Sequence, residues 1–480
     1  MGLQSSLFAG VAGLNANGQT ISIIADNIAN TNTVGFKSSR AEFVDVLAGN
    51  LGGGGSGRIG AGVRLSGVTQ SFTQGSLEST GVTTDLAIDG GGFFILQDTT
   101  GVFYSRAGLF SLNASQVLVN SQGQAVQGFG VTAGVPNGAL ASIDLSSISS
   151  TPRPTSLVEI NINLDPNDQA LAGGAAGFNH TNAVTTSNSQ TGIRIYDSLG
   201  NPTNILVYFR KNDAAANSWF YYVGMNREDV DFASYGPPFN TFTTVAGHEQ
   251  DFFPIQSGTL SFDSQGALIT ESAAALSIDY DADGDGAISG AEVGAPLATP
   301  ANGGTGWAFT GGAASGQVIT FDFGTTPTEG GSGTDRTTQF GGATVSGANN
   351  FIRFLSQDGF TAGTLSNIDI DENGFVTGTF SNGQTQKLAQ VALATFANLS
   401  GLQRVGQNNF SESTASGQPV NGSPNTAGLG AIRSGFLEQS NTDLAEEFVR
   451  LILSQRAFQA NTRTISTANE LLANLVVLGQ

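Results

Sequence analysis

The C-terminal segment carries the clearest helical pattern in the chain. Its apolar residues recur at alternating steps of four and three positions, the spacing of a coiled-coil seam. The seam consists of Leu444, Phe448, Leu451, Gln455, Phe458, Thr462, Ile465, Asn469, Leu472 and Val476. No Gly or Pro interrupts the stretch from Asn441 to Leu478, so we predict one long helix, capped by Asn441 or Thr442.

The N-terminal segment has a similar pattern. Its seam consists of Leu7, Val11, Leu14, Gly18, Ile21, Ala25 and Ile28. Gly18 and Ala25 would permit the close approach of another helix, and we expect the N-terminal helix to end near Asn30–Gly35, where Asn, Thr and Gly accumulate.

Two interpretations of these terminal helices remain open. Each helix packs on its own domain, or the two helices pair with each other and with copies in neighbouring molecules. The second is favoured because the helices lie at opposite ends of the chain and because Gly-rich sequence, such as residues 49–62, sets them apart from the middle. The predicted assembly interface comprises Leu7, Leu14, Ile21, Ile28, Leu444, Phe448, Leu451, Phe458, Ile465 and Leu472.

The middle of the chain alternates between apolar and polar positions instead. The alternation is clear at 157–165 (LVEININLD), 204–209 (NILVYF) and 316–323 (GQVITFDF). A period of two is typical of strands with one buried face, and the many Gly, Asn and Asp residues between them are typical of turns. We therefore predict a mainly β chain with α-helical termini, whose strands are antiparallel and form a sandwich or a barrel-like fold.

Composition and charge argue against several classes of partner and site. The 480 residues suggest about two to four domains. A net charge of −20 argues against nucleic acid or an anionic membrane as a partner. The absence of cysteine excludes disulfides, zinc thiolate sites and a thiol nucleophile. No apolar run approaches the roughly 20 residues of a membrane span, and the N-terminus lacks the basic and apolar regions of a secretory signal peptide.

Both ends of the chain resemble a known family. ADNIANTNTVGFKSSRAEF at 25–43 is similar to the N-terminal signature of flagellar rod and hook proteins, and residues 436–472 resemble their shared C-terminal signature. In this family both ends form the inner core of a tubular filament and are disordered before assembly. The resemblance therefore implies a structural subunit, not an enzyme.

The middle of the chain favours the hook branch of this family. Residues 84–130 and 366–410 resemble the two halves of an inner β-rich domain, and 193–211 with WFYY at 219–222 are similar to an outer domain that rod proteins generally lack. Residues 337–345 and 356–365 agree with the hook branch as well.

The resemblance implies a discontinuous multi-domain chain that builds outward from the core and then returns. The expected parts are 1–75 with 431–480 as core helices and arms, 76–150 with 336–430 as the inner domain, and 151–335 as the outer domain.

The resemblance also implies a function and partners. The subunit would polymerise into a curved, flexible tube that transmits motor torque to the filament. Its partners would be copies of itself, the distal rod protein, the hook cap, the hook–filament junction proteins and the flagellar type III export apparatus, which exports it without cleavage. Two alternatives remain: another axial protein of the rod or junction, or a secreted calcium-binding adhesin or enzyme whose ends are incidental.

An acidic loop, DADGDGAISGAE at 281–292, matches the twelve-residue calcium loop position by position. The predicted oxygen ligands are Asp281, Asp283, Asp285, Ala287 through its carbonyl, Ser289 and Glu292. Four carboxylates held together without a cation would repel one another. The flanking residues do not predict the two helices of an EF-hand, and a solvated acidic turn remains the alternative.

Three other motifs do not predict a functional site. DENG at 371–374 is interpreted as a hairpin turn. GSGRIG at 55–60 fits a dinucleotide-binding pattern, but it lacks the strand before it and the helix after it that such a site requires. The two histidines, His180 and His248, are interpreted as surface residues.

We predict that the acidic loop binds calcium weakly and stiffens the outer domain only after export. The expected dissociation constant is about 10⁻⁴–10⁻³ M, the range of extracellular calcium modules. Isothermal titration of calcium into the isolated outer domain should give a binding heat. No heat at millimolar calcium would contradict the prediction.

Overall fold

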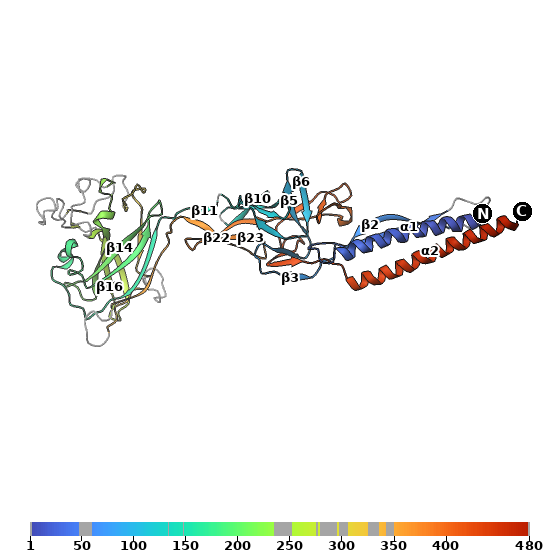
Figure 1. The fold of residues 1–480 in the computed structure, drawn as a ribbon. Coiled ribbons are helices and arrows are strands. Elements are labelled where there is room, and N and C mark those ends of the chain that lie inside the picture. Colours follow the sequence, from blue (N-terminus) through green and yellow to red (C-terminus); the bar gives the residue numbers. More distant parts are fainter. Residues whose placement is uncertain are drawn as a thin grey trace. The chain divides into compact units, whose positions relative to one another are not determined.

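The computed structural model describes residues 2–47, 60–132, 134–146, 148–234, 252–274, 277–278, 295–296, 306–324, 336–341 and 350–478. The chain divides into two compact units. The first combines Met1–Ile148 with Leu365–Gln480, and the second is Ser149–Thr364. The prediction of a mainly β chain with a helix at each end is confirmed (Figure 1).

The first unit contains both helices and most of the short strands. Its first half contains α1 (Gly2–Ala29), β1 (Ser39–Leu47), β2 (Gly60–Gln70), β3 (Leu77–Ser79), β4 (Leu86–Asp89), β5 (Phe93–Asp98), β6 (Gly101–Ser105), β7 (Phe110–Leu112), β8 (Leu118–Asn120), β9 (Ala125–Thr132) and β10 (Val135–Ser142). Its second half contains β22 (Gly363–Ile370), which begins in the second unit, β23 (Phe375–Phe380), β24 (Thr385–Val391), β25 (Leu393–Thr395), β26 (Gln403–Gly406), β27 (Asn409–Ser411), β28 (Val420–Gly422), β29 (Ala431–Ser434), β30 (Phe436–Glu438) and α2 (Leu444–Leu478).

The two helices lie side by side and run antiparallel (Figure 1). The antiparallel hairpin of β1 and β2 packs along α1, where Gly62 comes so close that a Cβ there would be 2.9 Å from the Cβ of Ala12. Gly62 also has a φ of +102°, which favours glycine. Neither of the described helices contains the apolar run that a membrane-spanning helix requires.

Strand pairs join the two halves of the first unit. Antiparallel pairing connects β3 with β30, β4 with β29, β5 with β25, and β6 with β27. Each pair takes one strand from before residue 148 and one from after residue 365. The β region therefore folds only when the N-terminal and C-terminal halves of the chain have come together.

The core of the first unit is built around β5. Its run Phe93, Phe94, Ile95 and Leu96 is buried on both faces, since alternate side chains enter two separate apolar clusters. Phe94 and Leu96 pack with Val126 and Val391 in one cluster. A continuous apolar run in the sequence thus corresponds to a strand covered on both sides.

The turn predicted at 371–374 is confirmed. It joins β22 to β23, whose registers place Ile370 opposite Val376. The Asp371 carboxylate accepts hydrogen bonds from the backbone N–H groups of Asn373 and Phe375, both at 2.9 Å. Gly374 has a φ of +76°, which completes the turn.

The described residues of the second unit form two main sheets and the short pair of β18 and β19. Its strands are β11 (Ser149–Ser150), β12 (Leu157–Asn163), β13 (Ser189–Tyr196), β14 (Pro202–Lys211), β15 (Ser218–Asn226), β16 (Phe252–Phe262), β17 (Leu268–Ala274), β18 (Ser277–Ile278), β19 (Ala295–Pro296), β20 (Thr320–Asp322) and β21 (Phe351–Gln357). Its short helical turns are η1 (Gly174–Gly177), η2 (His180–Asn182), η3 (Arg227–Asp229) and η4 (Phe232–Ser234).

The larger apolar core of this unit lies between its two main sheets. The larger sheet has the antiparallel order β13-β14-β15-β16-β17, and the smaller has the order β20-β12-β21. Ile160 of β12 is fully buried, and it shares one cluster with Val207 of β14 and with Trp219 and Tyr221 of β15. The sandwich expected from the alternating pattern is present, although β12 pairs parallel to β20, where antiparallel strands were predicted.

The return boundary between the domains differs from the prediction. Residues 336–364 were assigned to the inner domain, but the described residues of this range belong to the second unit. Strand β21 pairs antiparallel with β12, placing Leu355 opposite Ile160, and the Thr337 hydroxyl donates to the Ile160 carbonyl at 3.2 Å. Pairing between strands far apart in sequence leaves no local pattern, so the sequence could not place this boundary.

We predict that a fragment of residues 149–364 unfolds cooperatively, whereas a fragment of residues 151–335 is less stable by more than about 3 kcal/mol. The shorter fragment lacks β21, and exposing a fully buried apolar side chain costs about 1.5–3 kcal/mol. Both tryptophans, Trp219 and Trp307, lie in this core and report unfolding in urea by fluorescence. Equal unfolding midpoints would contradict the boundary at 364.

Candidate assembly site

The two terminal helices approach each other closely at small residues of α1. On α1, Gly10 and Gly13 lie against α2: an added Cβ would be 3.0 Å from Cγ1 of Ile465 at the first and 2.7 Å from Nδ2 of Asn461 at the second. The close approach was predicted at Gly18 and Ala25, but Gly18 has no atom within 4 Å of its Cβ position and Ala25 is exposed. The close approach is therefore at Gly10 and Gly13, and Ile465 of the predicted seam contacts α1 there.

The predicted interface residues divide into two groups. The half-buried group comprises Leu7, Leu14, Ile21, Ile28, Leu451, Phe458, Ile465 and Leu472. Leu444 and Phe448 are 44% and 46% exposed. The sequence pattern placed three further α2 residues in the seam, and these are exposed: Gln455, Thr462 and Asn469. The residue before each of them is buried or half-buried instead: Ser454, Asn461 and Ala468.

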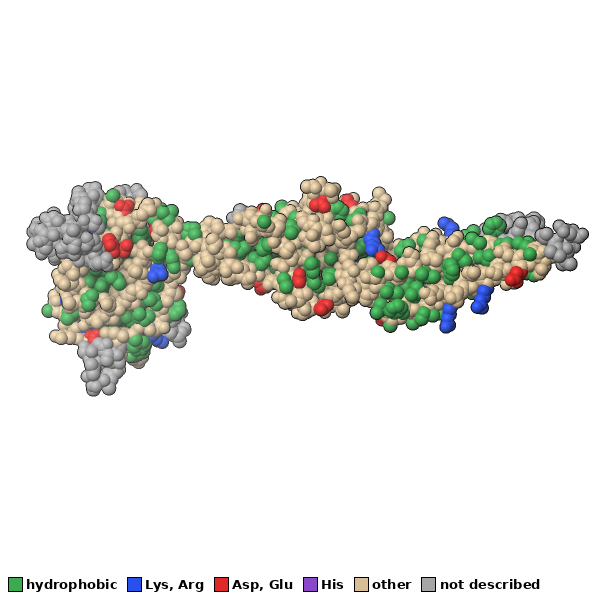
Figure 2. All heavy atoms as spheres, in the orientation of Figure 1, with side chains coloured by type: hydrophobic (Ala, Val, Ile, Leu, Met, Phe, Trp, Pro, Cys, Tyr) green, Lys and Arg blue, Asp and Glu red, His purple; other side chains and the backbone are tan. Residues whose placement is uncertain are grey.

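The outward side of α2 carries an exposed apolar patch over its first turns. We define the apolar patch as Leu444, Phe448, Val449, Ile452 and Leu453, each 44–59% exposed. Figure 2 shows hydrophobic side chains gathered over this part of α2. Contiguous exposed apolar surface of this kind marks an interaction site, because a monomer gains nothing from leaving it in water.

The start of α2 is fixed by its cap. The Asp443 carboxylate accepts from the N–H groups of Ala445 and Glu446, at 2.8 and 3.1 Å. Asp443 is therefore the N-cap, and the prediction of Asn441 or Thr442 was wrong. Asn441 instead joins segments: its Oδ1 accepts from the N–H of Ser38 at 2.8 Å, and its Nδ2 donates to the Ser71 carbonyl at 2.7 Å.

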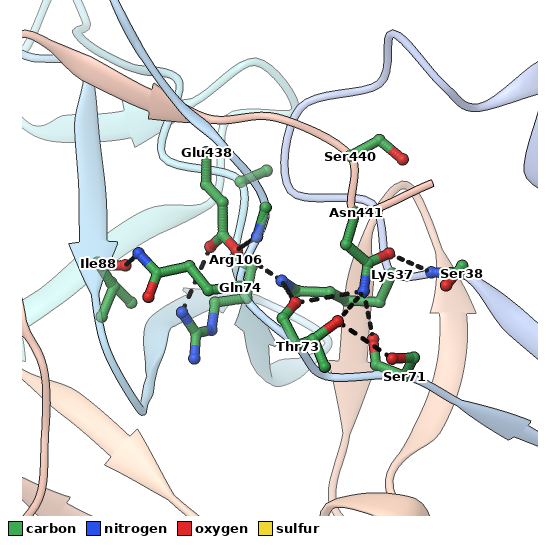
Figure 3. Close-up of polar contacts among 12 residues, drawn as sticks. Lys37, Ser38, Ser71, Thr73, Gln74, Ile88, Arg106, Glu438, Ser440 and Asn441 are labelled. Carbon is green, nitrogen blue, oxygen red and sulfur yellow. Dashed lines mark hydrogen bonds and ion pairs between the residues drawn. The ribbon is translucent and has the colours of Figure 1, made fainter. Parts of the chain in front are cut away.

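A buried ionic cluster lies where both helical arms enter the β region (Figure 3). We define it as Lys37, Arg106 and Glu438. Lys37 Nζ is 2.6 Å from Glu438 Oε1, and Arg106 Nη1 is 3.3 Å from Glu438 Oε2. The side chains of Lys37 and Glu438 are fully buried and that of Arg106 is 5% exposed. One carboxylate thus joins the arm after α1, the strand region and the arm before α2.

Further hydrogen bonds complete the ionic cluster. Lys37 Nζ donates to the Thr73 carbonyl at 2.8 Å, and the N–H of Gly75 donates to Glu438 Oε1 at 2.8 Å. Arg106 Nη2 donates to the Gly90 carbonyl at 2.8 Å, and its guanidinium lies over the Phe93 ring. These bonds tie the arm around residues 71–75 to the same point.

Burial decides the electrostatics of the ionic cluster. It lowers the pKa of Lys37 and of Arg106 from their usual values, and the Glu438 carboxylate acts against both shifts. Two cations share one anion in a site without water access, so the carboxylate is the group whose loss is most costly.

Other predicted site residues lie elsewhere. The calcium ligands Asp281, Asp283, Asp285, Ala287, Ser289 and Glu292 lie outside the described residues, as do His248 and residues 55–59. His180 is 5% exposed in η2, so its prediction as a surface residue was wrong. Phe178 and Ala183, two residues before it and three after it, pack into an apolar cluster, which draws this loop inward. Within the described ranges no group of three or more His, Cys, Asp or Glu side chains is placed to hold a metal ion.

We predict that Glu438→Gln lowers the free energy of unfolding of the first unit by about 3–5 kcal/mol, because it leaves two buried cations without an anion. Denaturant unfolding of the full chain, followed by circular dichroism, measures this change. Glu372→Gln is the control, since Glu372 pairs with Arg433 at 2.7 Å while 66% exposed, and it should cost less than about 1 kcal/mol. Equal effects of the two substitutions would show that the ionic cluster does not hold the arms.

Four flagellar family models match the chain. The flagellar basal body protein FlaE D2 domain matches residues 161–360, close to the bounds of the second unit. The flagellar hook protein FlgE/F/G D1 domain matches 87–171. The flagella basal body rod protein model matches 7–37, and the flagellar basal body rod FlgEFG protein C-terminal model matches 433–477.

Full-length relatives are similar to the whole chain. The flagellar hook protein FlgE of Borreliella burgdorferi is 32% identical, covering 99% of this chain and 100% of that protein. That of Escherichia coli is 32% identical over 98% of both chains, and that of Treponema pallidum is 30% identical over 99% and 100%. Similarity at this level over both full lengths shows that the chain belongs to the flagellar hook protein FlgE family.

Proposed function

We propose that the chain is the structural subunit of the bacterial flagellar hook and that it polymerises through α1 and α2. The family is structural, and the chain is not an enzyme. The apolar patch carries the proposal. It is exposed on α2, and its five residues lie within residues 433–477, which match the C-terminal family model. Burial of the apolar patch against a neighbouring copy would supply the driving force of assembly.

Assembly would use different faces on neighbouring copies. The apolar patch lies on one side of α2 only, so it would contact another surface of the next copy. Such head-to-tail contacts give an open helical polymer when the rotation does not close into a ring. The second unit would make weaker lateral contacts that slide past one another, so that the tube bends as it transmits motor torque to the filament.

The family places the chain in the bacterial flagellum. We propose further that the subunit is extracellular and that the flagellar type III apparatus exports it without cleavage. Its neighbours at the ends of the tube would be the distal rod protein, the hook cap and the hook–filament junction proteins. The loop at 281–292 would bind calcium only outside the cell.

Another axial protein, of the rod or the junction, is the alternative. The match of a D2 domain over 161–360 and the full-length similarity to hook proteins favour the hook. The form of the polymer separates the two functions in electron micrographs: a hook subunit should give curved tubes, and a straight polymer would favour the rod or the junction.

We predict that the double substitution Phe448→Gln/Ile452→Gln raises the critical concentration for polymerisation by roughly thirtyfold. Two half-exposed apolar side chains lose about 2 kcal/mol of burial in the polymer, and about 1.4 kcal/mol corresponds to a tenfold change. Sedimentation of the polymer at a series of subunit concentrations measures the effect.

The matched control is Val82→Gln/Val420→Gln, which removes two apolar side chains that are 51% and 63% exposed in the first unit outside the helices. The control should change the critical concentration much less. Both variants should keep the unfolding free energy of the monomer within about 0.5 kcal/mol for each substitution, since all four sites are on the surface. Unchanged polymerisation of the Phe448→Gln/Ile452→Gln variant would remove the support for the proposed function.

A further inference from the structure

A β-bulge exposes an Asn-Gly pair, Asn137–Gly138, on strand β10 of the first unit. The register between β9 and β10 passes from Pro136 to Leu140 without pairing the three residues between them. Asn137 and Gly138 are both exposed, and Gly138 has a φ of +75°. The backbone N–H of Gly138 therefore lies outside the paired positions of the β9–β10 hairpin.

The Asn137 side chain is held over the peptide bond that follows it. Its Oδ1 accepts a hydrogen bond from the N–H of Ala139 at 3.2 Å, which forms an Asx turn. Such a turn brings the amide carbon Cγ toward the backbone nitrogen of Gly138, and the donor at Ala139 polarises the amide for attack by that nitrogen. On the other side, a Cβ at Gly130 would be 2.8 Å from Nδ2 of Asn137, so the glycine leaves room for the amide nitrogen.

The other Asn-Gly pairs lack this combination. The chain contains six such pairs, and five of them lie among the described residues. The N–H of Gly374 donates to the Asp371 carbonyl at 2.9 Å. The N–H of Gly383 donates to the Phe380 carbonyl, also at 2.9 Å. In both pairs a hydrogen bond must break before the glycine nitrogen can attack its neighbour's amide.

Regular secondary structure holds the two remaining described pairs. Gly422 lies opposite Leu393 in the ladder of β25 and β28. In α1 the Asn17 amide points back along the helix, since its Nδ2 donates to the Gly13 carbonyl at 2.9 Å. Among the described pairs, Asn137–Gly138 thus combines a glycine N–H outside any ladder with a side chain held over it.

We propose that Asn137 is a site of spontaneous deamidation, so that this position gains a carboxylate as the protein ages. The Gly138 nitrogen loses its proton to hydroxide and forms a bond with Cγ of Asn137. The Cγ–Nδ2 bond then breaks, and Nδ2 takes a proton from water and leaves as ammonia. Water opens the resulting succinimide at either carbonyl, which gives aspartate or isoaspartate. The proposal is independent of the proposed function, because it concerns the folded first unit alone.

The modification changes the character of an exposed strand. The sequence of β10, VPNGALAS, contains no charged residue. Val135 and Leu140, on either side of the bulge, are 65% and 39% exposed. Deamidation places a negative charge between them, which makes this strand less prone to pair with another chain. An aged molecule therefore differs from a new one at this surface.

Peptide mapping of the full chain tests the proposal. The folded chain is incubated at mildly alkaline pH, and tandem mass spectrometry follows the conversion of each Asn. Asn137 should react roughly two- to tenfold faster than Asn382, because attack at Asn382 requires the hydrogen bond of Gly383 to open first. The rate at Asn137 should rise with pH, since the attacking nitrogen must lose its proton.

Asn382–Gly383 is the matched comparison within the same chain. Asn382 Oδ1 accepts from the N–H of Gln384 at 3.1 Å, an Asx turn of the same form, and Gly383 has a φ of +78°. The hydrogen bond of the Gly383 N–H is the main difference from the pair in β10. In concentrated denaturant both turns are lost, so the ratio of the two rates should fall toward one.

Asn137→Gln checks the assignment of the site. Attack on the longer side chain would require a six-membered ring, so position 137 should stay unmodified while Asn382 reacts as before. Two results would overturn the proposal. One is an Asn137 that reacts no faster than Asn382 in the folded chain. The other is the same ratio of rates in folded and denatured chains, which would show that the bulge does not select this site.

Discussion

The Glu438 carboxylate is the group on which the arrangement of the first unit depends. It lies between Lys37 and Arg106, which are separated from it by 401 and 332 positions in the sequence, and all three side chains are buried. Lys37 follows α1 by a short arm, and α2 starts soon after Glu438. The ionic cluster therefore sets where both helices leave the β region, and it forms only when the two ends of the chain have met.

The two helices have an inward face, where they contact each other, and an outward face that carries the apolar patch. On the inward faces Gly10 and Gly13 lie against Ile465 and Asn461, which allows close contact. The apolar patch faces outward over the first turns of α2. Helices gain most of their stability from packing of an apolar face, so burial of the apolar patch against a neighbouring copy would stabilise this pair further.

The local sequence pattern predicted the helices, strands and turns. The helix register, the ionic cluster and the domain boundary depend on contacts between distant segments. The two helices, the strands at 157–165 and 204–209 and the turn at 371–374 were predictable because their signals lie within a few residues. The helix register was not, since Ser454 and Gln455 are equally polar and only the glycines opposite distinguish them. The ionic cluster and the return boundary at 364 depend on contacts between distant segments. Asp443 was missed as the cap because Asn441, Thr442 and Asp443 all fit that role.

A cryo-EM map of the assembled tube tests the central claim most directly. In that map the apolar patch of α2 should be buried against a neighbouring copy, while Glu438 remains between Lys37 and Arg106 in every subunit. A tube in which Phe448 and Ile452 face solvent, or in which the arms have separated from Glu438, would contradict the claim that the ionic cluster positions these helices for assembly.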